Sequence, residues 1–141
     1  MDITMFNLKK FSGLNKQSVI LPTGEYVATL NSSSQSKPKD DSTMLRLIWK
    51  IKEGKYQGDY FFSYFNMTKE DSLKVLFIMI SNMGFEPEKV RNISELYGSD
   101  CFLKVRLLNH IVHGKSNIVD RYLPLNDSVL QNFPYGLLLS T

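Results

Sequence analysis

The sequence predicts a small all-β protein, a five-stranded barrel with one helix between the third and fourth strands. Two observations carry this prediction. Five short segments alternate apolar and polar residues with the period of a strand that has one buried face. Between the third and the fourth of them, apolar residues recur instead at helical spacing. A chain of 141 residues forms one domain and can bury a core without a metal or a disulfide.

The first two predicted strands cover residues 25–30 and 44–52. The second alternates most clearly, and its inward face is expected to be Leu45, Leu47, Trp49 and Ile51. Residues 31–42 separate the two strands and are rich in serine. This low-complexity stretch predicts a long flexible loop.

The third predicted strand covers residues 59–67 and is aromatic on both faces. A helix is expected to follow, with Thr68 as its N-cap, Asp71 at the capping-box position and Gly84 as its stop. The buried stripe of this helix is predicted to be Leu73, Leu76, Phe77 and Ile80.

One helical turn near residues 93–97 then leads to strands over residues 102–108 and 117–123. Three strands, a helix and two strands is the element order of the OB fold. We therefore expect a five-stranded OB domain over residues 1–125, in which residues 1–20 are a lead-in segment. Residues 126–141 are expected to form an apolar C-terminal tail.

Composition points to the cytoplasm. The single cysteine, Cys101, excludes an internal disulfide and favours a reducing compartment. The first residues lack a signal-peptide pattern, and no apolar run approaches the roughly 20 residues that span a bilayer. Positive charge gathers in predicted strands: residues 43–67 hold four basic and two acidic side chains, residues 101–123 four and one, and the helical residues 68–100 four and six. An anionic partner on a sheet face would suit this distribution.

No catalytic or metal-binding constellation is predicted, so we expect no enzyme activity and no cofactor. His110 and His113 are three residues apart, but no second cysteine accompanies them and no glutamate lies between them. They suit a mildly basic loop near an anionic partner better than a metal site. Cys101 opens an apolar strand and is expected to be a small buried hydrophobic residue rather than a nucleophile.

Several short motifs recur in the order of a known family. Residues 21–26 read Leu-Pro-Thr-Gly-Glu-Tyr, and residues 47–58 contain Glu-Gly-Lys-Tyr-Gln-Gly after a strand. The further matches are Asn66 at a strand end, Met83-Gly84 closing the helix, Leu96-Tyr97-Gly98 before the fourth strand, and residues 117–124. Over roughly residues 20–125 the chain resembles phage and prophage single-stranded DNA-binding proteins.

This resemblance implies an OB fold and sequence-independent binding of single-stranded DNA during phage DNA replication or recombination, in the host cytoplasm. Partners beyond the DNA stay open and include further copies of the chain and replication or recombination proteins. Many single-stranded DNA-binding proteins end in an acidic tail that recruits partners. Here residues 126–141 contain one acidic residue, Asp127, so we expect the tail to pack on the domain or on another subunit.

Binding a single strand without sequence preference requires cations for the phosphates and flat rings on which bases stack. The outward faces of the second, third and fourth strands combine both kinds of side chain. The candidate DNA-binding residues on these strands are Arg46, Ile48, Lys50, Lys52, Tyr60, Phe62, Tyr64, Phe102, Lys104 and Arg106, and those in the loop are Lys37 and Lys39.

Aromatic residues in strands usually belong to the core, and Phe61 and Phe65 can take that role. Because side chains alternate in direction along a strand, Tyr60, Phe62 and Tyr64 point to the opposite face of the barrel wall. They therefore face a ligand or are covered by the N-terminal segment, the tail or a partner chain. The rival function is a phage structural or adaptor protein that binds another protein through a small β-barrel. An accessory nuclease inhibitor or recombination cofactor is a third alternative.

Overall fold

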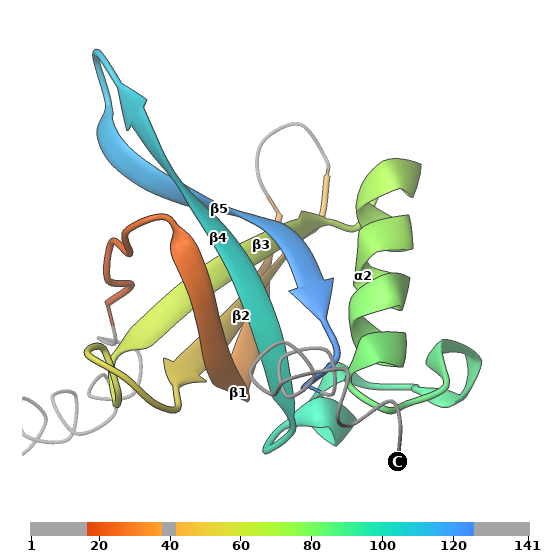
Figure 1. The fold of residues 1–141 in the computed structure, drawn as a ribbon. Coiled ribbons are helices and arrows are strands. Elements are labelled where there is room, and N and C mark those ends of the chain that lie inside the picture. Colours follow the sequence, from red (N-terminus) through yellow and green to blue (C-terminus); the bar gives the residue numbers. More distant parts are fainter. Residues whose placement is uncertain (1–16, 38–41, 126–141) are drawn as a thin grey trace, which may run out of the picture.

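A computed structural model describes residues 17–37 and 42–125 (Figure 1). Three strands come first, then the helix with two short 3₁₀ turns, then two strands, which confirms the predicted element order. The elements are β1 (Gly24–Ser36), β2 (Met44–Ile51), β3 (Tyr60–Asn66), α2 (Glu70–Asn82), η1 (Pro87–Lys89), η2 (Ile93–Leu96), β4 (Asp100–His110) and β5 (Gly114–Leu123).

The strands form one antiparallel sheet in the order β3-β2-β1-β4-β5. This is a small OB-like β-barrel fold whose sheet is not closed, because β3 and β5 lie at its two edges. Helix α2 contacts both edge strands, and the β4–β5 hairpin extends well beyond the other strands (Figure 1). None of the helices in the described part of the chain has the length and hydropathy needed to cross a bilayer.

Strand β1 is longer than predicted, and the loop predicted over residues 31–42 is partly strand. The pairing of β1 with β2 continues past a bulge between Leu30 and Ser32 and ends at Ser36, which lies opposite Met44. Serine is a weak strand former, but the neighbouring strand supplies hydrogen-bonding partners that the local sequence does not reveal. Strands β4 and β5 also extend beyond their predicted bounds, into a hairpin that turns just before Gly114 (φ 77°).

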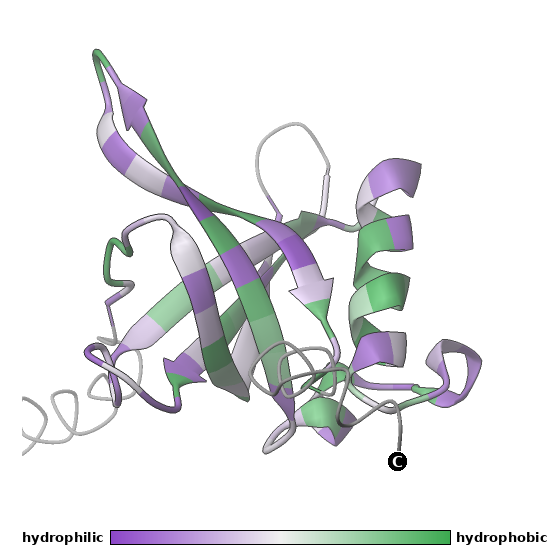
Figure 2. Cartoon of the chain, viewed as in Figure 1, coloured by the Kyte–Doolittle hydropathy of each residue, from purple (hydrophilic) through white to green (hydrophobic). Residues whose placement is uncertain are grey.

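The core lies on the inward face of the sheet, as the alternation predicted. Figure 2 shows hydrophobic and hydrophilic bands alternating along β4. Trp49 and Phe61 are the largest fully buried side chains, and the indole N–H of Trp49 donates to the Ser63 hydroxyl at 3.0 Å. The ring centroid of Tyr122 on β5 lies 6.2 Å from that of Trp49 and 5.5 Å from that of Phe65. The four predicted inward residues of β2 are all buried: Leu45, Leu47, Trp49 and Ile51.

The helix confirms the predicted element but corrects two of its details. Lys69, not Thr68, is the N-cap residue, and it makes no side-chain cap. The N–H and hydroxyl of Thr68 instead donate to Asn66 Oδ1, at 3.0 and 2.6 Å, because this Asn ends β3 in a local turn. Asp71 therefore has no capping-box partner.

The buried face of α2 is centred on Leu76, Met79 and Ile80, while Phe77 is 52% exposed. One residue step turns a helix by about 100°, so Phe77 points away once Leu76 faces the sheet. Tertiary packing decides which side of a wide apolar stripe on a helix is buried. The predicted turn near residue 93 is confirmed as η2, with a capping box formed by Asn92 and Glu95.

Part of the predicted lead-in belongs to the fold. Ser18 forms a parallel bridge with Tyr60 on β3, and the N–H of Val19 donates to the Tyr60 carbonyl at 2.9 Å. Leu21 is fully buried, and the side-chain amide of Asn117 on β5 bonds both its N–H and its C=O at 2.8 Å. Residues 18–21 thus connect the two edge strands and bridge one end of the gap between them.

The Asn117→Ala variant should be destabilised by about 1–3 kcal/mol, because the N–H and C=O of Leu21 lose their partners. Urea unfolding followed by circular dichroism measures the change. Asn109→Ala, at an exposed position of β4, is the control and should leave stability within about 0.5 kcal/mol. Equal midpoints for the two variants would show that the Leu21 bonds do not stabilise the fold.

Candidate nucleic-acid interface

Six of the predicted residues lie together on the outer face of β2 and β3. The register pairs Arg46 with Tyr64, Ile48 with Phe62, and Lys50 with Tyr60. Directly opposed residues on one face of an antiparallel pair are in contact distance. We call these six residues the aromatic–basic face: Arg46, Ile48, Lys50, Tyr60, Phe62 and Tyr64.

Arg46 and two rings form the centre of this face. The guanidinium carbon of Arg46 lies 5.2 Å from the ring centroid of Phe62, in a cation–π arrangement. Phe62 is half-buried, whereas Tyr64 is 57% exposed and turns its ring to solvent. Across β1, the residues opposite Ile48 and Arg46 are Ser32 and Ser34, whose side chains are small and polar.

The positive charges of Arg46 and Lys50 are not neutralised by any ion pair within the described residues. The Nε atom of Arg46 is buried and lacks a hydrogen-bond partner in that same part of the chain. A buried guanidinium N–H without an acceptor is costly, so the site favours an added acceptor such as a phosphate oxygen after a small side-chain shift.

Lys52 lies just past the end of β2 and already has an anionic partner. Its ammonium group forms a salt bridge with Asp100, which also accepts a hydrogen bond from the Thr29 hydroxyl at 2.5 Å. The hydrogen bond to Asp100, together with the charge of that carboxylate, raises the pKa of Lys52. Lys52 and Lys50 line a groove of about 430 Å³. Lys50 is thus the groove's cation without an ion pair to a described residue.

The predicted residues on β4 do not join the aromatic–basic face. Phe102 is only 6% exposed and lies between Val27 and Leu123, so its predicted role on an open surface is not supported by its burial. Lys104 lies opposite Glu25, four positions along β1 from the Thr29 that opposes Lys50. At about 3.3 Å per residue, that is a separation of about 13 Å along β1.

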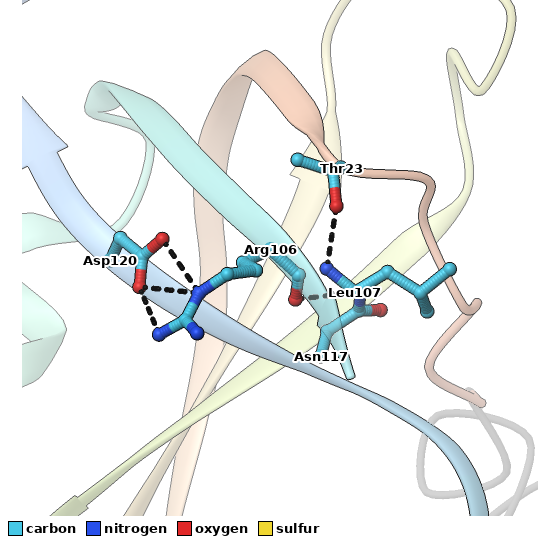
Figure 3. A network of polar contacts seen from close by, with 5 residues as sticks. All are labelled: Thr23, Arg106, Leu107, Asn117 and Asp120. Carbon is cyan, nitrogen blue, oxygen red and sulfur yellow. Dashed lines mark hydrogen bonds and ion pairs between the residues drawn. The ribbon is translucent and has the colours of Figure 1, made fainter. Parts of the chain in front are cut away.

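Arg106 is part of a structural network (Figure 3). Its guanidinium donates to both carboxylate oxygens of Asp120 at 3.0–3.2 Å, and this pairing raises the pKa of Arg106. The N–H of Leu107 donates to the Thr23 hydroxyl at 2.9 Å, and the Asn117 amide donates to the Arg106 carbonyl at 3.4 Å. These bonds join the start of β1 to β4 and β5.

The loop residues contribute less to this geometry. Lys37 is exposed just after β1, and Lys39 lies outside the described residues. The ring centroids of His110 and His113 are 6.4 Å apart, and within residues 17–37 and 42–125 no third ligand completes a metal cluster. Ile111 and Val112 lie at the tip of the β4–β5 hairpin and are 103% and 83% exposed, and no role is predicted for them from the sequence. An apolar pair inside a predicted turn was the available signal.

Cys101 is unsuited to nucleophilic chemistry. Its side chain is buried, and burial raises the pKa of its thiol to about 12. The thiol therefore stays protonated at neutral pH, and the thiolate is the reactive form.

Because the Cys101 pKa is raised in the folded state, stability should fall at alkaline pH. Above about pH 8.5 the unfolded chain loses this proton while the folded chain keeps it, so unfolding is favoured as pH rises towards 12. The slope reaches at most about 1.4 kcal/mol per pH unit. Urea unfolding at pH 7, 9 and 10 should show a shallower pH dependence for Cys101→Ala. Parallel curves for variant and wild type would contradict the assignment.

Neither a model of a known protein family nor a curated protein sequence matches this chain.

Proposed function

We propose that this protein binds single-stranded DNA without sequence preference through the aromatic–basic face. The observation that carries the proposal is Arg46 stacked on Phe62 beside the exposed Tyr64, with no carboxylate among the described residues to neutralise the guanidinium. A single strand presents phosphates and bare base faces, and this face offers a partner for each.

Each residue type has a distinct role in this proposal. Tyr64 is the exposed ring on which a base stacks, and Phe62 supports the guanidinium that contacts a phosphate. Lys50 lies about 13 Å from Arg46 along β2 and contacts a second phosphate. The face contains no amide or carboxylate side chain. Together with Arg and Lys, amides and carboxylates make the most selective hydrogen bonds to base edges. Stacking and charge then dominate, which supports binding that tolerates any sequence.

The sequence resemblance to phage and prophage single-stranded DNA-binding proteins supports a role in phage DNA replication or recombination. The proposed activity is binding rather than catalysis, consistent with the buried, protonated thiol of Cys101. No cofactor enters this proposal.

Fluorescence anisotropy with labelled oligo-dT and with a duplex of equal length, at low and high salt, tests the proposal. We expect tight, salt-sensitive binding to the single strand and little binding to the duplex. No binding at micromolar protein and low salt would overturn it. That result would favour the adaptor function, in which the same face contacts another protein.

Lys50→Ala should reduce the salt dependence of binding, because one phosphate contact is lost. For a single strand, the slope of log K against log salt should become shallower by about 0.7. Lys104→Ala is the matched control, because Lys104 is also an exposed strand lysine but faces Glu25. An equal change in both variants would mean that the DNA also contacts β4, and would contradict the restriction of the binding surface to β2 and β3.

A further inference from the structure

A cleft of about 260 Å³ opens between the two edge strands, where a closed barrel would pair β3 with β5. Tyr64 and Phe62 lie on its β3 side, and Ile118 lies on its β5 side. Val75 of α2 lines it as well, and so does Asn117, the residue that bonds Leu21. Since Phe62 and Tyr64 also belong to the aromatic–basic face, the cleft is continuous with the proposed DNA-binding surface.

The lining of the cleft suits an uncharged, flat group. No charged side chain lines it, and the buried rings of Phe61, Phe65 and Tyr122 contribute to its walls. Apolar side chains from β5 and from α2 remain partly exposed here, since Ile118 is 43% exposed and Val75 is 40% exposed. A phosphate finds no cation here, whereas an aromatic ring finds apolar contact on both faces.

The backbone of Tyr64 adds polar groups to this cleft. Met67 N–H donates to the Thr43 carbonyl, so the odd-numbered residues of β3 bond to the β2 side and the even-numbered residues face the free edge. Tyr60 and Phe62 bond to residues 18–19 in this direction. The N–H and C=O of Tyr64 point the same way, and no described residue bonds them. One donor and one acceptor therefore lie side by side at the edge of the cleft.

We propose that this cleft holds one nucleobase of the bound single strand. A nucleobase combines an uncharged apolar ring with a rim of hydrogen-bond donors and acceptors, which matches the apolar walls and the Tyr64 backbone. The volume is below the 300–1,000 Å³ usual for drug-sized ligands and suits a single ring system. The sugar and phosphates stay outside, beside Arg46. This inference rests on the proposed function and adds a base-binding site to it.

The test fills the cleft by Ile118→Trp and compares binding to oligo-dT with binding to an abasic strand of equal length. We expect about a tenfold loss of affinity for oligo-dT, no change for the abasic strand and an unchanged salt slope, because only a base contact is removed. Ile78→Trp is the matched control: Ile78 is 55% exposed on α2 and does not line the cleft. It should bind oligo-dT as the wild type does.

Two outcomes would overturn the inference while leaving the proposed function intact. One is wild-type affinity of Ile118→Trp for oligo-dT, and the other is an equal loss on both strands. Absence of any single-strand binding by the wild type would instead remove the proposed function itself. If Ile118→Trp does not fold by circular dichroism, Val75→Trp fills the same cleft from α2 and gives the same comparison.

Discussion

Replacing Tyr64 by alanine is expected to lower the affinity for single-stranded oligo-dT by roughly 5- to 150-fold, the equivalent of about 1–3 kcal/mol for one stacked base. The side chain is 57% exposed, so its removal takes a stacking surface from the aromatic–basic face without opening the core. Anisotropy titrations at fixed salt measure the loss, and thermal melting by circular dichroism should show little change.

Two controls separate stacking from other effects. Tyr64→Phe keeps the ring and should bind within about twofold of the wild type, because stacking does not use the hydroxyl. Tyr97→Ala removes a 39% exposed tyrosine outside the face and should leave affinity unchanged. Wild-type affinity of Tyr64→Ala would mean that Tyr64 does not carry a base, and the proposal would lose its main stacking residue.

Replacing Trp49 by alanine is expected to cost about 3–5 kcal/mol of folding free energy, a large part of the roughly 5–15 kcal/mol of a typical domain. Trp49 is fully buried, donates its indole N–H to Ser63 and packs against Tyr122. Its removal leaves a cavity and takes away one partner of the Ser63 hydroxyl. Urea unfolding by far-UV circular dichroism is the suitable measurement, because Trp49 is the chain's single tryptophan and the variant loses that fluorescence.

Ile78→Ala is the control for this variant, because the same kind of truncation at an exposed helix position should cost less than about 1 kcal/mol. Ser63→Ala, alone and combined with a Trp49→Phe change, separates the hydrogen bond from the packing. A Trp49→Ala cost below 1 kcal/mol would contradict the assignment of Trp49 to the centre of the core.

The aromatic–basic face was predictable because its geometry is local. The period of a strand decides that Trp49 and Phe61 point inward and that Arg46 and Tyr64 point outward. A short connection between β2 and β3 makes these two strands neighbours, so residues on their outer faces come together without information from elsewhere in the chain.

The β4 residues were not predictable as part of a site, because their position depends on pairing between distant segments. Lys104 pairs with Glu25, 79 positions earlier in the chain, and this register moves it away from Lys50. The sequence alone does not show whether Arg106 binds a ligand or pairs with a carboxylate of the same chain. Only the register of β4 with β5 brings Asp120 within 3.0 Å of its guanidinium. The prediction that a side chain points outward from a strand does not show which residues cover it or neutralise its charge.

By itself, then, the sequence determined the element order, the inward residues of β2 and the six outward residues that now form one face. The tertiary structure alone decided the extension of β1 to Ser36, the exposure of Phe77, the bonds of Leu21 to Asn117 and the cleft between β3 and β5. The physical reason is the range of the interactions. Side-chain alternation is set by each residue's own backbone, whereas registers, burial of a helix flank and the gap between edge strands depend on free energies shared by segments far apart in the chain.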